Sequence, residues 1–276
     1  MANNSDQIVI EAGRSERHYW RDLWSYRELF FFLAWRDILV RYKQTVIGIA
    51  WSVLRPLLTM VIFTVVFGKL AKLPSEGVPY AILVFAAMLP WHFFASAVAE
   101  GSNSLIQNAT IISKVYFPRI IVPVGAVVVS IVDFLISIAL LLVLMIWYRF
   151  VPNWHIFAVP LFLILAAAVS IGLILWLAAL NVRYRDFRYI VPFLIQIGLL
   201  ISPVGFSSSV VPEQWRLVYS LNPMVGVIDG FRWSILGAQT PLYIPGLVSS
   251  IAMAILLLLT GSFYFRRTER SFADVI

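Results

Sequence analysis

Few residues in this chain have the types and spacing that a catalytic site requires. The segment closest to a phosphate-binding loop, G-x-x-x-x-G-K-[ST], ends at Gly68-Lys69, but Phe63 stands at its first glycine and Leu70 at its hydroxyl residue. That loop needs glycines to cradle phosphates and a hydroxyl to bind magnesium. The H-E-x-x-H and G-x-S-x-G patterns of hydrolases are also missing from the sequence. We therefore expect this chain not to be an enzyme and not to hydrolyse ATP by itself.

Metal and redox chemistry are not expected either. The sequence has no cysteine, which excludes disulfides, thiolate metal sites and cysteine nucleophiles. Its three histidines, His18, His92 and His155, are scattered and adjoin the edges of apolar stretches. We interpret them as interfacial residues, and we expect no metal site and no cofactor in this chain.

Four ionisable residues lie in or near apolar stretches: Arg55, Glu100, Asp133 and Asp229. Such groups are costly in hydrocarbon and usually face protein or water. Asp133 is the deepest of them and is either a lining or helix-pairing residue, or a neutral or hydrogen-bonded structural acid. Asp229 and Arg232 are three residues apart, a spacing that favours a local ion pair on a helix.

Aromatic side chains are the other group that could bind a ligand, because the apolar faces of sugars stack on aromatic rings. Several of them cluster in two neighbouring apolar stretches, namely Phe63, Phe67, Tyr80, Phe85, Trp91, Phe93 and Phe94. Belts at the membrane surface or packing in a core account for any one of them. The alternative is that some line the path of a glycan.

Six long apolar stretches must position these residues. They lie at 46–67, 79–99, 119–148, 155–180, 189–205 and 242–265. Arg55-Pro56 interrupts the first, and the fifth is short and holds two prolines. With 61% hydrophobic and 13% charged residues, the chain lacks the polar surface of a soluble domain of this size. Because a span needs roughly 20 apolar residues and lipid leaves no partner for an open backbone, we predict an all-α polytopic membrane protein with six transmembrane helices.

The positions of the basic residues predict the orientation. Most of the 21 lysines and arginines lie before the first stretch, in the second and fourth gaps between stretches, and in the tail. By the positive-inside rule, both termini face the cytoplasm. Topology and anionic headgroups explain the net charge of +7, so no nucleic-acid partner is needed. The first 19 residues are polar and do not resemble a signal peptide. We divide the chain into a cytoplasmic arm (1–45), a transmembrane domain (46–265) and a cytoplasmic tail (266–276).

Three segments outside the six stretches also have a recognisable pattern. Residues 20–35 mix apolar residues with charges, as an interfacial helix does; a soluble amphipathic cap is the alternative. The apolar face would contain Trp20, Leu23, Trp24 and Phe31. The gap at 101–118 predicts a short cytoplasmic helix capped near Asn103, which would either dock a partner or merely connect. The apolar segment at 206–241, with its prolines and glycines, predicts two short re-entrant helices on the outer side.

At these residues the chain resembles the permeases of ABC-2-type transporters, and in particular those that export O-antigen, capsule or teichoic acid. Four blocks carry the resemblance: LAWRDILVRYKQTVIGIAWSVLRPLLTMVIFTVVFG (33–68), SLIQNATIISKVYFPR (104–119), LNVRYRDFRYIVPF (180–193) and VPEQWRLVYSLNPMVGVIDGFRWSILG (211–237). Together they extend over most of the chain. Their combination in this order is specific for the family, and none specifies the exact substrate.

The resemblance implies a homodimeric permease in the bacterial inner membrane, joined to two separate ATPase subunits that bind ATP and magnesium. It implies that Trp20–Trp35 is the interface helix. It assigns coupling to the ATPase to residues of two cytoplasmic segments, Asn103, Ser104, Leu105, Ile106, Asn108, Ile111, Arg183, Arg185 and Arg188. It implies a channel through the dimer, for which we expect a partial lining of Phe63, Phe67, Tyr80, Phe85 and Trp91.

The substrate implied by the resemblance is an undecaprenyl-linked polysaccharide, most simply O-antigen. Capsule, teichoic acid, lipid or drug export are alternatives within the family. A membrane glycan polymerase or glycosyltransferase is an alternative of another class, but it would show clustered acids and a large loop outside the membrane, and the sequence has neither. A passive channel or scaffold would explain the spans but not the docking segments.

Overall fold

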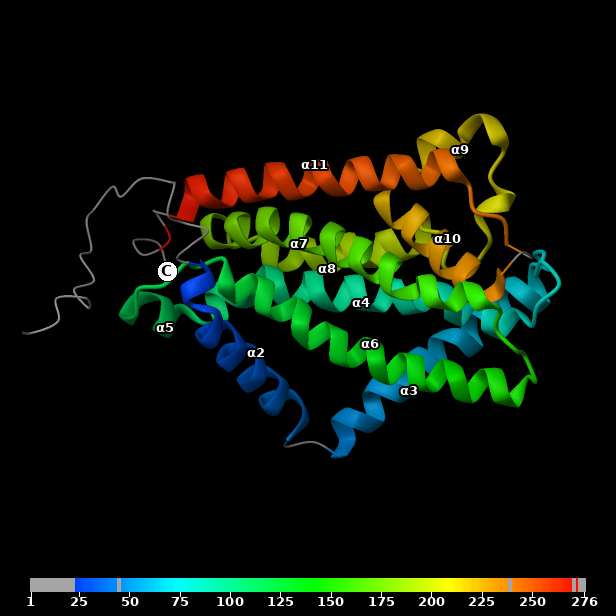
Figure 1. The fold of residues 1–276 in the computed structure, drawn as a ribbon, viewed down its shortest axis with the longest axis horizontal. Coiled ribbons are helices and arrows are strands. Elements are labelled where there is room, and N and C mark those ends of the chain that lie inside the picture. The colour runs from blue at the N-terminus through cyan, green and yellow to red at the C-terminus, as the bar shows by residue number, and fades with distance from the viewer. Residues whose placement is uncertain (1–22, 44–45, 238–239, 270–271, 273–276) are drawn as a thin grey trace, which may run out of the picture.

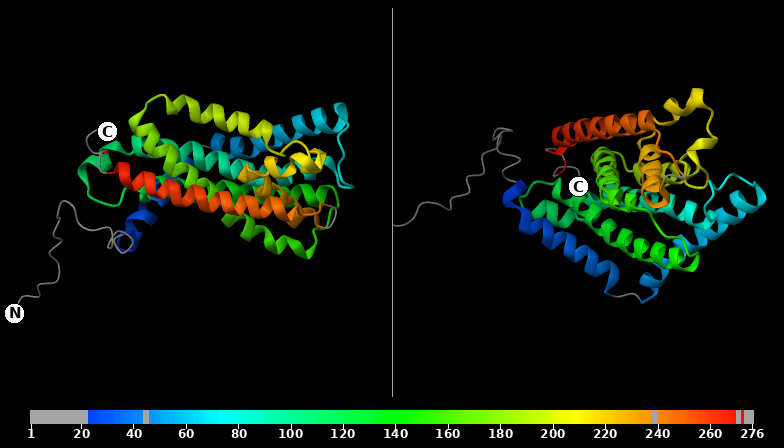
Figure 2. Two further views of the ribbon diagram at one scale, coloured as in Figure 1. Left: turned by 90° about the horizontal axis from the view of Figure 1, so that it is seen from above. Right: turned by 45° about the vertical axis from the view of Figure 1, so that its right-hand side comes forward.

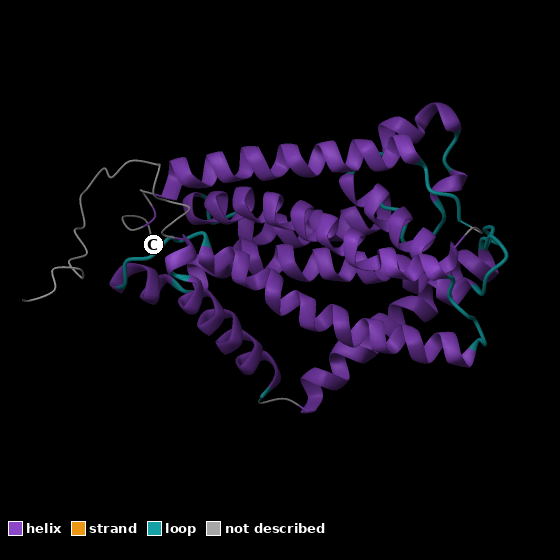
Figure 3. Cartoon of the chain, in the orientation of Figure 1, coloured by secondary structure: helices purple, strands orange, loops and turns teal. Residues whose placement is uncertain are grey.

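The computed structural model describes residues 23–43, 46–237, 240–269 and 272, and every regular element in these ranges is helical (Figure 3). The long helices form a bundle, in which α4, α7 and α11 run along the longest axis of the molecule and α3 runs obliquely to it (Figure 1). They are α3 (Val46–Phe63), α4 (Tyr80–Gln107), α6 (Ile121–Trp147), α7 (Val159–Arg183), α8 (Phe187–Ile201) and α11 (Ile244–Glu269). The prediction of an all-α protein is confirmed.

Five of the segments are long and apolar enough to cross a membrane: Val53–Leu70, Tyr80–Gln107, Ile121–Trp147, Trp154–Arg183 and Ile244–Glu269. They correspond to five of the six predicted spans. The remaining one, the fifth predicted span (189–205), corresponds to α8, which has 15 residues and is therefore about 22 Å long. That is less than the hydrocarbon thickness of about 30 Å, so α8 as a complete span stays a prediction.

The two ends of the bundle differ in the short elements that they hold. At one end, the α5 end, lie α5 (Ala109–Lys114), the start of α2 (Arg27–Tyr42) and the end of α11 (Figure 1). At the other, the α9 end, lie the π-helix η2 (Thr64–Leu70) and the helices α9 (Glu213–Tyr219) and α10 (Pro223–Leu236). The described basic segments of the second gap, of the fourth gap and of the end of α11 therefore lie at the α5 end.

Helix α4 is the centre of the bundle. It packs against α6, α7, α10, α8 and α3, and residues 81–91 are buried on every side. The sequence predicts that this helix ends near residue 99 and that a new one starts at Asn103. This prediction is wrong, because α4 continues through Gln107. The hydroxyls of Ser102 and Ser104 donate to the carbonyls of Ala99 and Gly101 within the same helix, so they do not cap a new one.

Helices α7 and α11 form the most extensive helix pair, and two glycines allow their close approach. A Cβ atom added at Gly261 would lie 2.4 Å from the backbone oxygen of Gly172, and one added at Gly172 would lie 2.7 Å from the backbone of Leu257. Contacts between small residues are a usual way to pack membrane helices.

One boundary in the first part of the chain differs from the prediction. We predict the interface helix at 20–35, but α2 extends to Tyr42. The Arg55-Pro56 pair, which interrupts the first apolar stretch, does not end the helix, because α3 contains Pro56 and continues to Phe63, where η2 begins. The helix tolerates this proline because neighbouring groups in a membrane bundle can satisfy the backbone that it leaves unpaired.

The prediction of two short helices between 206 and 241 is confirmed by α9 and α10, which the 3₁₀ turn η4 (Ser208–Val210) precedes. Helix α10 begins with standard start signals: the Asn222 side chain accepts a hydrogen bond from the Met224 amide, and Pro223 follows the cap. Helix α10 packs into the bundle, whereas α9 keeps large exposed side chains.

Candidate functional site

Three of the aromatic residues predicted for the channel meet at the α9 end. The rings of Phe63 and Phe67 contact each other edge to face, with centroids 5.4 Å apart. Both rings lie against Gly205, and the Tyr80 hydroxyl donates to the Gly205 carbonyl at 2.7 Å. We call Phe63, Phe67 and Tyr80 the outer aromatic cluster. All three are partly exposed, so a ligand passing this surface could contact them.

Phe85 and Trp91 do not belong to this cluster, and the structure corrects the expectation that they line a channel. Their exposed fractions are 1% and 3%. Phe85 is part of the main hydrophobic core, and Trp91 packs against Gly198 of α8 and near Phe94. These two rings hold α4 to its neighbours, so neither offers a surface to a ligand.

The outward surfaces of α3 and α8 combine polar with apolar groups. Both helices pack on α4, and exposed side chains lie along α8 and along the described part of α3 from residue 53. Arg55 and Gln196 are exposed, and the Thr59 hydroxyl donates to the Arg55 carbonyl at 2.9 Å. We call the exposed side of α3 and α8, which includes Arg55 and Gln196, the α3–α8 face. An arginine and a glutamine at this depth are unusual toward lipid and point to contact with protein or water.

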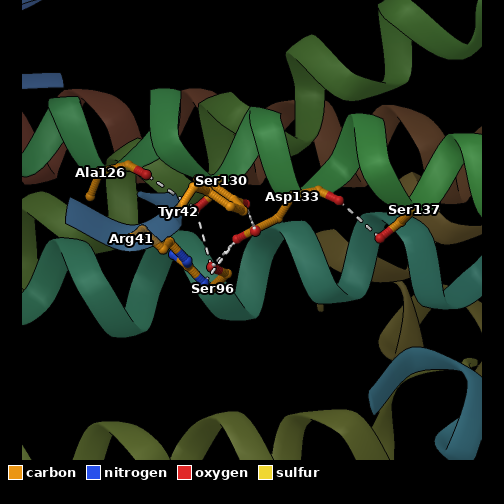
Figure 4. A network of polar contacts seen from close by, with 7 residues as sticks. All are labelled: Arg41, Tyr42, Ser96, Ala126, Ser130, Asp133 and Ser137. Carbon is orange, nitrogen blue, oxygen red and sulfur yellow. Dashed lines mark hydrogen bonds and ion pairs between the residues drawn. The ribbon is translucent and has the colours of Figure 1, made fainter. Parts of the chain in front are cut away.

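Asp133 joins three helices through its carboxylate (Figure 4). It accepts a hydrogen bond from the Tyr42 hydroxyl, forms an ion pair with Arg41 at 2.9 Å and accepts from Ser96 at 3.3 Å. Arg41 and Tyr42 come from the end of α2, and Ser96 from α4. Burial and the neighbouring carboxylate raise the pKa of Tyr42. Asp133 is therefore a helix-pairing acid, one of the two roles expected, but the sequence did not indicate its partners.

Arg232 on α10 is 1% exposed and donates to three backbone carbonyls, those of Leu83, Val204 and Phe206, at 3.3, 3.1 and 2.8 Å. It thereby ties α10 to α4 and to the segment after α8. The local ion pair with Asp229 predicted from the sequence is not formed within 4 Å, because the guanidinium is turned toward these carbonyls.

A polar cavity of about 70 Å³ lies beside Arg232. Among the residues around it are Glu76, Asp229, Tyr219 and Ser207. Burial raises the pKa of Asp229, and the Arg232 guanidinium opposes this shift. The carboxylate of Glu76 accepts hydrogen bonds from Ser207 and, at 2.8 Å, from Ser209. The cavity is too small for a sugar, so its polar groups serve to position the outer helices.

The predicted coupling residues are divided by the structure into buried and exposed ones. Leu105 is fully buried and Ser104 is nearly so. The amide of Asn181 donates to Asn103, and Arg36 donates to Asn108 at 2.7 Å. Ile106 and Ile111 pack against a hydrophobic cluster at this end. Leu105 and Ser104 are therefore core positions at the α5 end, whereas Asn103, Ile106, Asn108 and Ile111 are only partly buried, and their role in coupling stays a prediction.

The exposed residues at the α5 end include several that the sequence did not single out. Gln107, Thr110, Ser113, Lys114, Val115 and Tyr116 are exposed, and we call them the α5 surface. Tyr116 is 70% exposed. Arg183, Arg185 and Arg188, which were predicted, are exposed between α7 and α8. Two exposed segments at the same end of the bundle could together contact a partner.

Helix α2 has both buried and exposed apolar side chains. Leu33 and Ala34 of α2 are buried, whereas Phe31 of α2 and Trp24, which precedes the helix, are exposed. Leu23 is partly buried, and Trp20 lies outside the described residues. Exposed aromatic side chains on such a helix suit the boundary between headgroups and hydrocarbon.

Residues 28–236 match the model of a family described as "ABC-2 type transporter". A protein from Myxococcus xanthus named "O-antigen export system permease protein RfbA" is 28% identical over 93% of this chain and 98% of its own length. Two proteins of the same name from Klebsiella pneumoniae are 28% and 26% identical, each over 87% of this chain and 92% of its own length.

Proposed function

The chain belongs to the ABC-2 type transporter family, and from this premise we propose that it is the permease subunit of an exporter of lipid-linked O-antigen. The similarity to relatives named O-antigen export permeases over most of both chains carries the proposal. The membrane-spanning helices and the departure from a phosphate-binding loop at Phe63 and Leu70 are consistent with a permease that uses a separate ATPase.

We infer that two copies form the transport path between their α3–α8 faces. A polysaccharide is too polar to cross lipid and too wide for a pore within one such subunit. The polar groups Arg55 and Gln196 are exposed on this face, and the outer aromatic cluster lies where the end of α3 and η2 contact Gly205 in the segment after α8. Aromatic rings can hold successive sugars weakly, which lets a polymer bind and still move.

In this proposal the α5 end faces the cytoplasm, the protein lies in the bacterial inner membrane, and both termini are cytoplasmic. The basic residues of the α7–α8 connection favour this orientation. Two ATPase subunits would bind at the α5 surface and at Arg183, Arg185 and Arg188, and they would supply the ATP and magnesium sites. The permease itself would hold neither.

A deletion strain tests the substrate. We expect cells without this chain to lose O-antigen from the surface and to accumulate undecaprenyl-linked polymer on the cytoplasmic side, with both effects reversed by a plasmid copy. Normal surface O-antigen in the deletion strain would contradict the proposal, whereas loss of another surface polymer would reassign the substrate within the same family.

Experiments on purified protein test which subunit hydrolyses ATP. The isolated permease should show no ATP hydrolysis, and its complex with the ATPase should show magnesium-dependent hydrolysis. Metal-dependent hydrolysis by the isolated permease, at a rate comparable to that of the complex, would contradict the absence of a nucleotide site.

A further inference from the structure

A groove lies between α7 and α11 on the α5 side of the Gly172–Gly261 crossing. Its volume is about 770 Å³. The residues that line it are Trp176, Arg183, Leu259, Thr260, Phe263, Tyr264, Arg267 and Thr268. Of these lining residues, the functions proposed above use only Arg183, at the contact with the ATPase. Its lining combines cationic, aromatic and aliphatic side chains, which suggests a ligand that also has a charged and an apolar part.

The charge of the groove is positive and uncompensated by its own lining. Arg183 and Arg267 line it, and no aspartate or glutamate does. Neither guanidinium forms an ion pair within 4 Å with any residue that the structure describes. The nearby Glu269 is engaged elsewhere, because it accepts a hydrogen bond from the Arg119 amide at 2.7 Å. Two arginines near one groove are well suited to a phosphate group.

The polarity of the groove changes along α11. From Arg267 back to Thr260 is about two turns, or roughly 10 Å. The rings of Trp176 and Tyr264 stack in this interval, with centroids 4.3 Å apart, and the Trp176 indole donates to the Thr260 hydroxyl at 3.1 Å. Leu259 and Phe263 are 66% and 69% exposed. The groove thus leads from a cationic end to an apolar side, as an amphiphile requires.

We propose that this groove binds an anionic phospholipid of the cytoplasmic leaflet. Its phosphate would lie at Arg183 and Arg267, and an acyl chain would cover Leu259 and Phe263. The choice of leaflet, the exclusion of a second copy from the groove and the link to the ATPase rest on the proposed function, whereas the binding of an anionic lipid does not. Basic sites between membrane helices on the cytoplasmic side are a known way to bind anionic headgroups.

The position of the groove argues against coverage by a second copy of the chain. Seen from above, α8 and α3 lie along one side of the bundle and α11 along the other (Figure 2). The α3–α8 face, where we place the second copy, is therefore remote from the groove. Lipid is the medium that surrounds the remaining surface of an integral membrane protein.

Lipid binding would also affect the contact with the ATPase. Arg183 lines the groove and begins the basic connection of Arg183, Arg185 and Arg188. A phospholipid at Arg183 would hold this connection at the membrane surface. The lipid composition of the inner leaflet would thereby influence docking of the ATPase without any change in the transport path.

The test measures lipid retention by native mass spectrometry on the purified full-length protein, with phosphatidylglycerol and phosphatidylcholine offered together. We expect the wild type to retain phosphatidylglycerol. The double variant Arg183→Gln/Arg267→Gln should bind it at least about tenfold more weakly, since each surface cation contributes to anionic lipid binding. The matched control is Arg185→Gln, which removes an exposed arginine of the same connection that does not line the groove.

Several outcomes would overturn the proposal. They are equal binding of the two lipids by the wild type, unchanged binding by the double variant, and an equal loss in Arg185→Gln. Competition by millimolar inorganic phosphate would mean a free-anion site, and preference for undecaprenyl pyrophosphate would mean a substrate site. Cross-linking between two copies through Phe263→Cys would assign the groove to a protein interface. A melting temperature measured in phosphatidylcholine shows whether the variants are folded, and the assay does not depend on transport.

Discussion

At the scale of single residues, two polar side chains, the buried Arg232 and the partly buried Asp133, hold elements together that are distant in sequence. Arg232 joins α10 to α4 and to the chain after α8, and Asp133 joins α2, α4 and α6. In a chain with so few charges, these residues determine how outer and inner segments attach to the bundle. The cost of burying them is offset only while all their partners are in place.

For Arg232, we predict that Arg232→Lys lowers the stability of the purified protein by about 2 kcal/mol or more, because one ammonium cannot serve three carbonyls in the geometry of a guanidinium. Thermal unfolding in detergent measures this loss. Arg149→Lys, a change at an exposed position, is the matched control. Equal melting temperatures for the two variants would show that the three hydrogen bonds contribute little.

For Asp133, we predict a coupling of about 1 kcal/mol or more between Tyr42→Phe and Asp133→Asn in a double-mutant cycle, because hydrogen bonds to charged groups are stronger than neutral ones. The control is Ser137→Ala, since the Ser137 hydroxyl donates to the backbone of Asp133 and not to its carboxylate. Strictly additive effects of the two changes on unfolding would mean that the contact does not stabilise α2.

The sequence indicated which residues are unusual but not what they contact. Asp133 was recognised as a deep acid, whereas its partners Arg41 and Tyr42 lie about ninety positions earlier and share no local pattern with it. Phe85 and Trp91 look the same in sequence as Phe63 and Tyr80. On α4 every side chain from 81 to 91 is buried, so periodicity cannot separate a core face from a channel face there.

At the scale of elements, the sequence predicts where the long helices lie, but it does not predict several of the residues at which they end. The apolar stretches predict the long helices, because a backbone in lipid has to form its hydrogen bonds within the segment, and a helix does so. The end of α4 was missed because serine and asparagine are ambiguous signals. In water they favour caps, but within a packed bundle they donate to their own helix, as Ser104 does to Gly101.

The crossing of α7 and α11 allows a prediction with an internal control. Gly261→Ala should destabilise the protein by about 1–3 kcal/mol, because its methyl group would meet the backbone oxygen of Gly172. Gly125→Ala in α6 should be neutral or stabilise by up to about 1 kcal/mol, because its methyl group would meet no atom within 4 Å. Thermal unfolding compares the two, and a similar effect of both changes would contradict close packing at the crossing.

At the α5 end, we predict that Tyr116→Ala leaves the melting temperature unchanged and weakens binding of the ATPase, because its ring is exposed. Leu105→Ala should instead lower stability by about 2–5 kcal/mol, because it opens a cavity in a core position. Tyr148→Ala, at the exposed α9 end of α6, is the control for loss of an aromatic ring. Co-purification with the ATPase is the measurement, and normal binding by Tyr116→Ala would remove the α5 surface from the interface.

At the scale of the whole molecule, the exposed polar groups of the α3–α8 face allow a test of the proposed contact between two copies. A cysteine in place of Gln196 should be cross-linked between two copies by a short bifunctional maleimide, because we place the α3–α8 faces opposite each other. The background is clean, since the chain has no cysteine. A cysteine in place of Ile255, exposed on α11, should not be cross-linked. Equal cross-linking at both positions, or none at Gln196, would contradict this arrangement.

The continuity of α4 has a mechanical consequence. Its 28 residues make a strut of about 42 Å, which is supported along its length by the helices around it. One end joins α5, and the other begins at Tyr80, whose hydroxyl holds the Gly205 carbonyl. A force applied to α5 would therefore be transmitted as axial compression along α4 to the outer aromatic cluster. Pro90 lies within α4 and has no backbone N–H to donate, so the helix would bend most easily there.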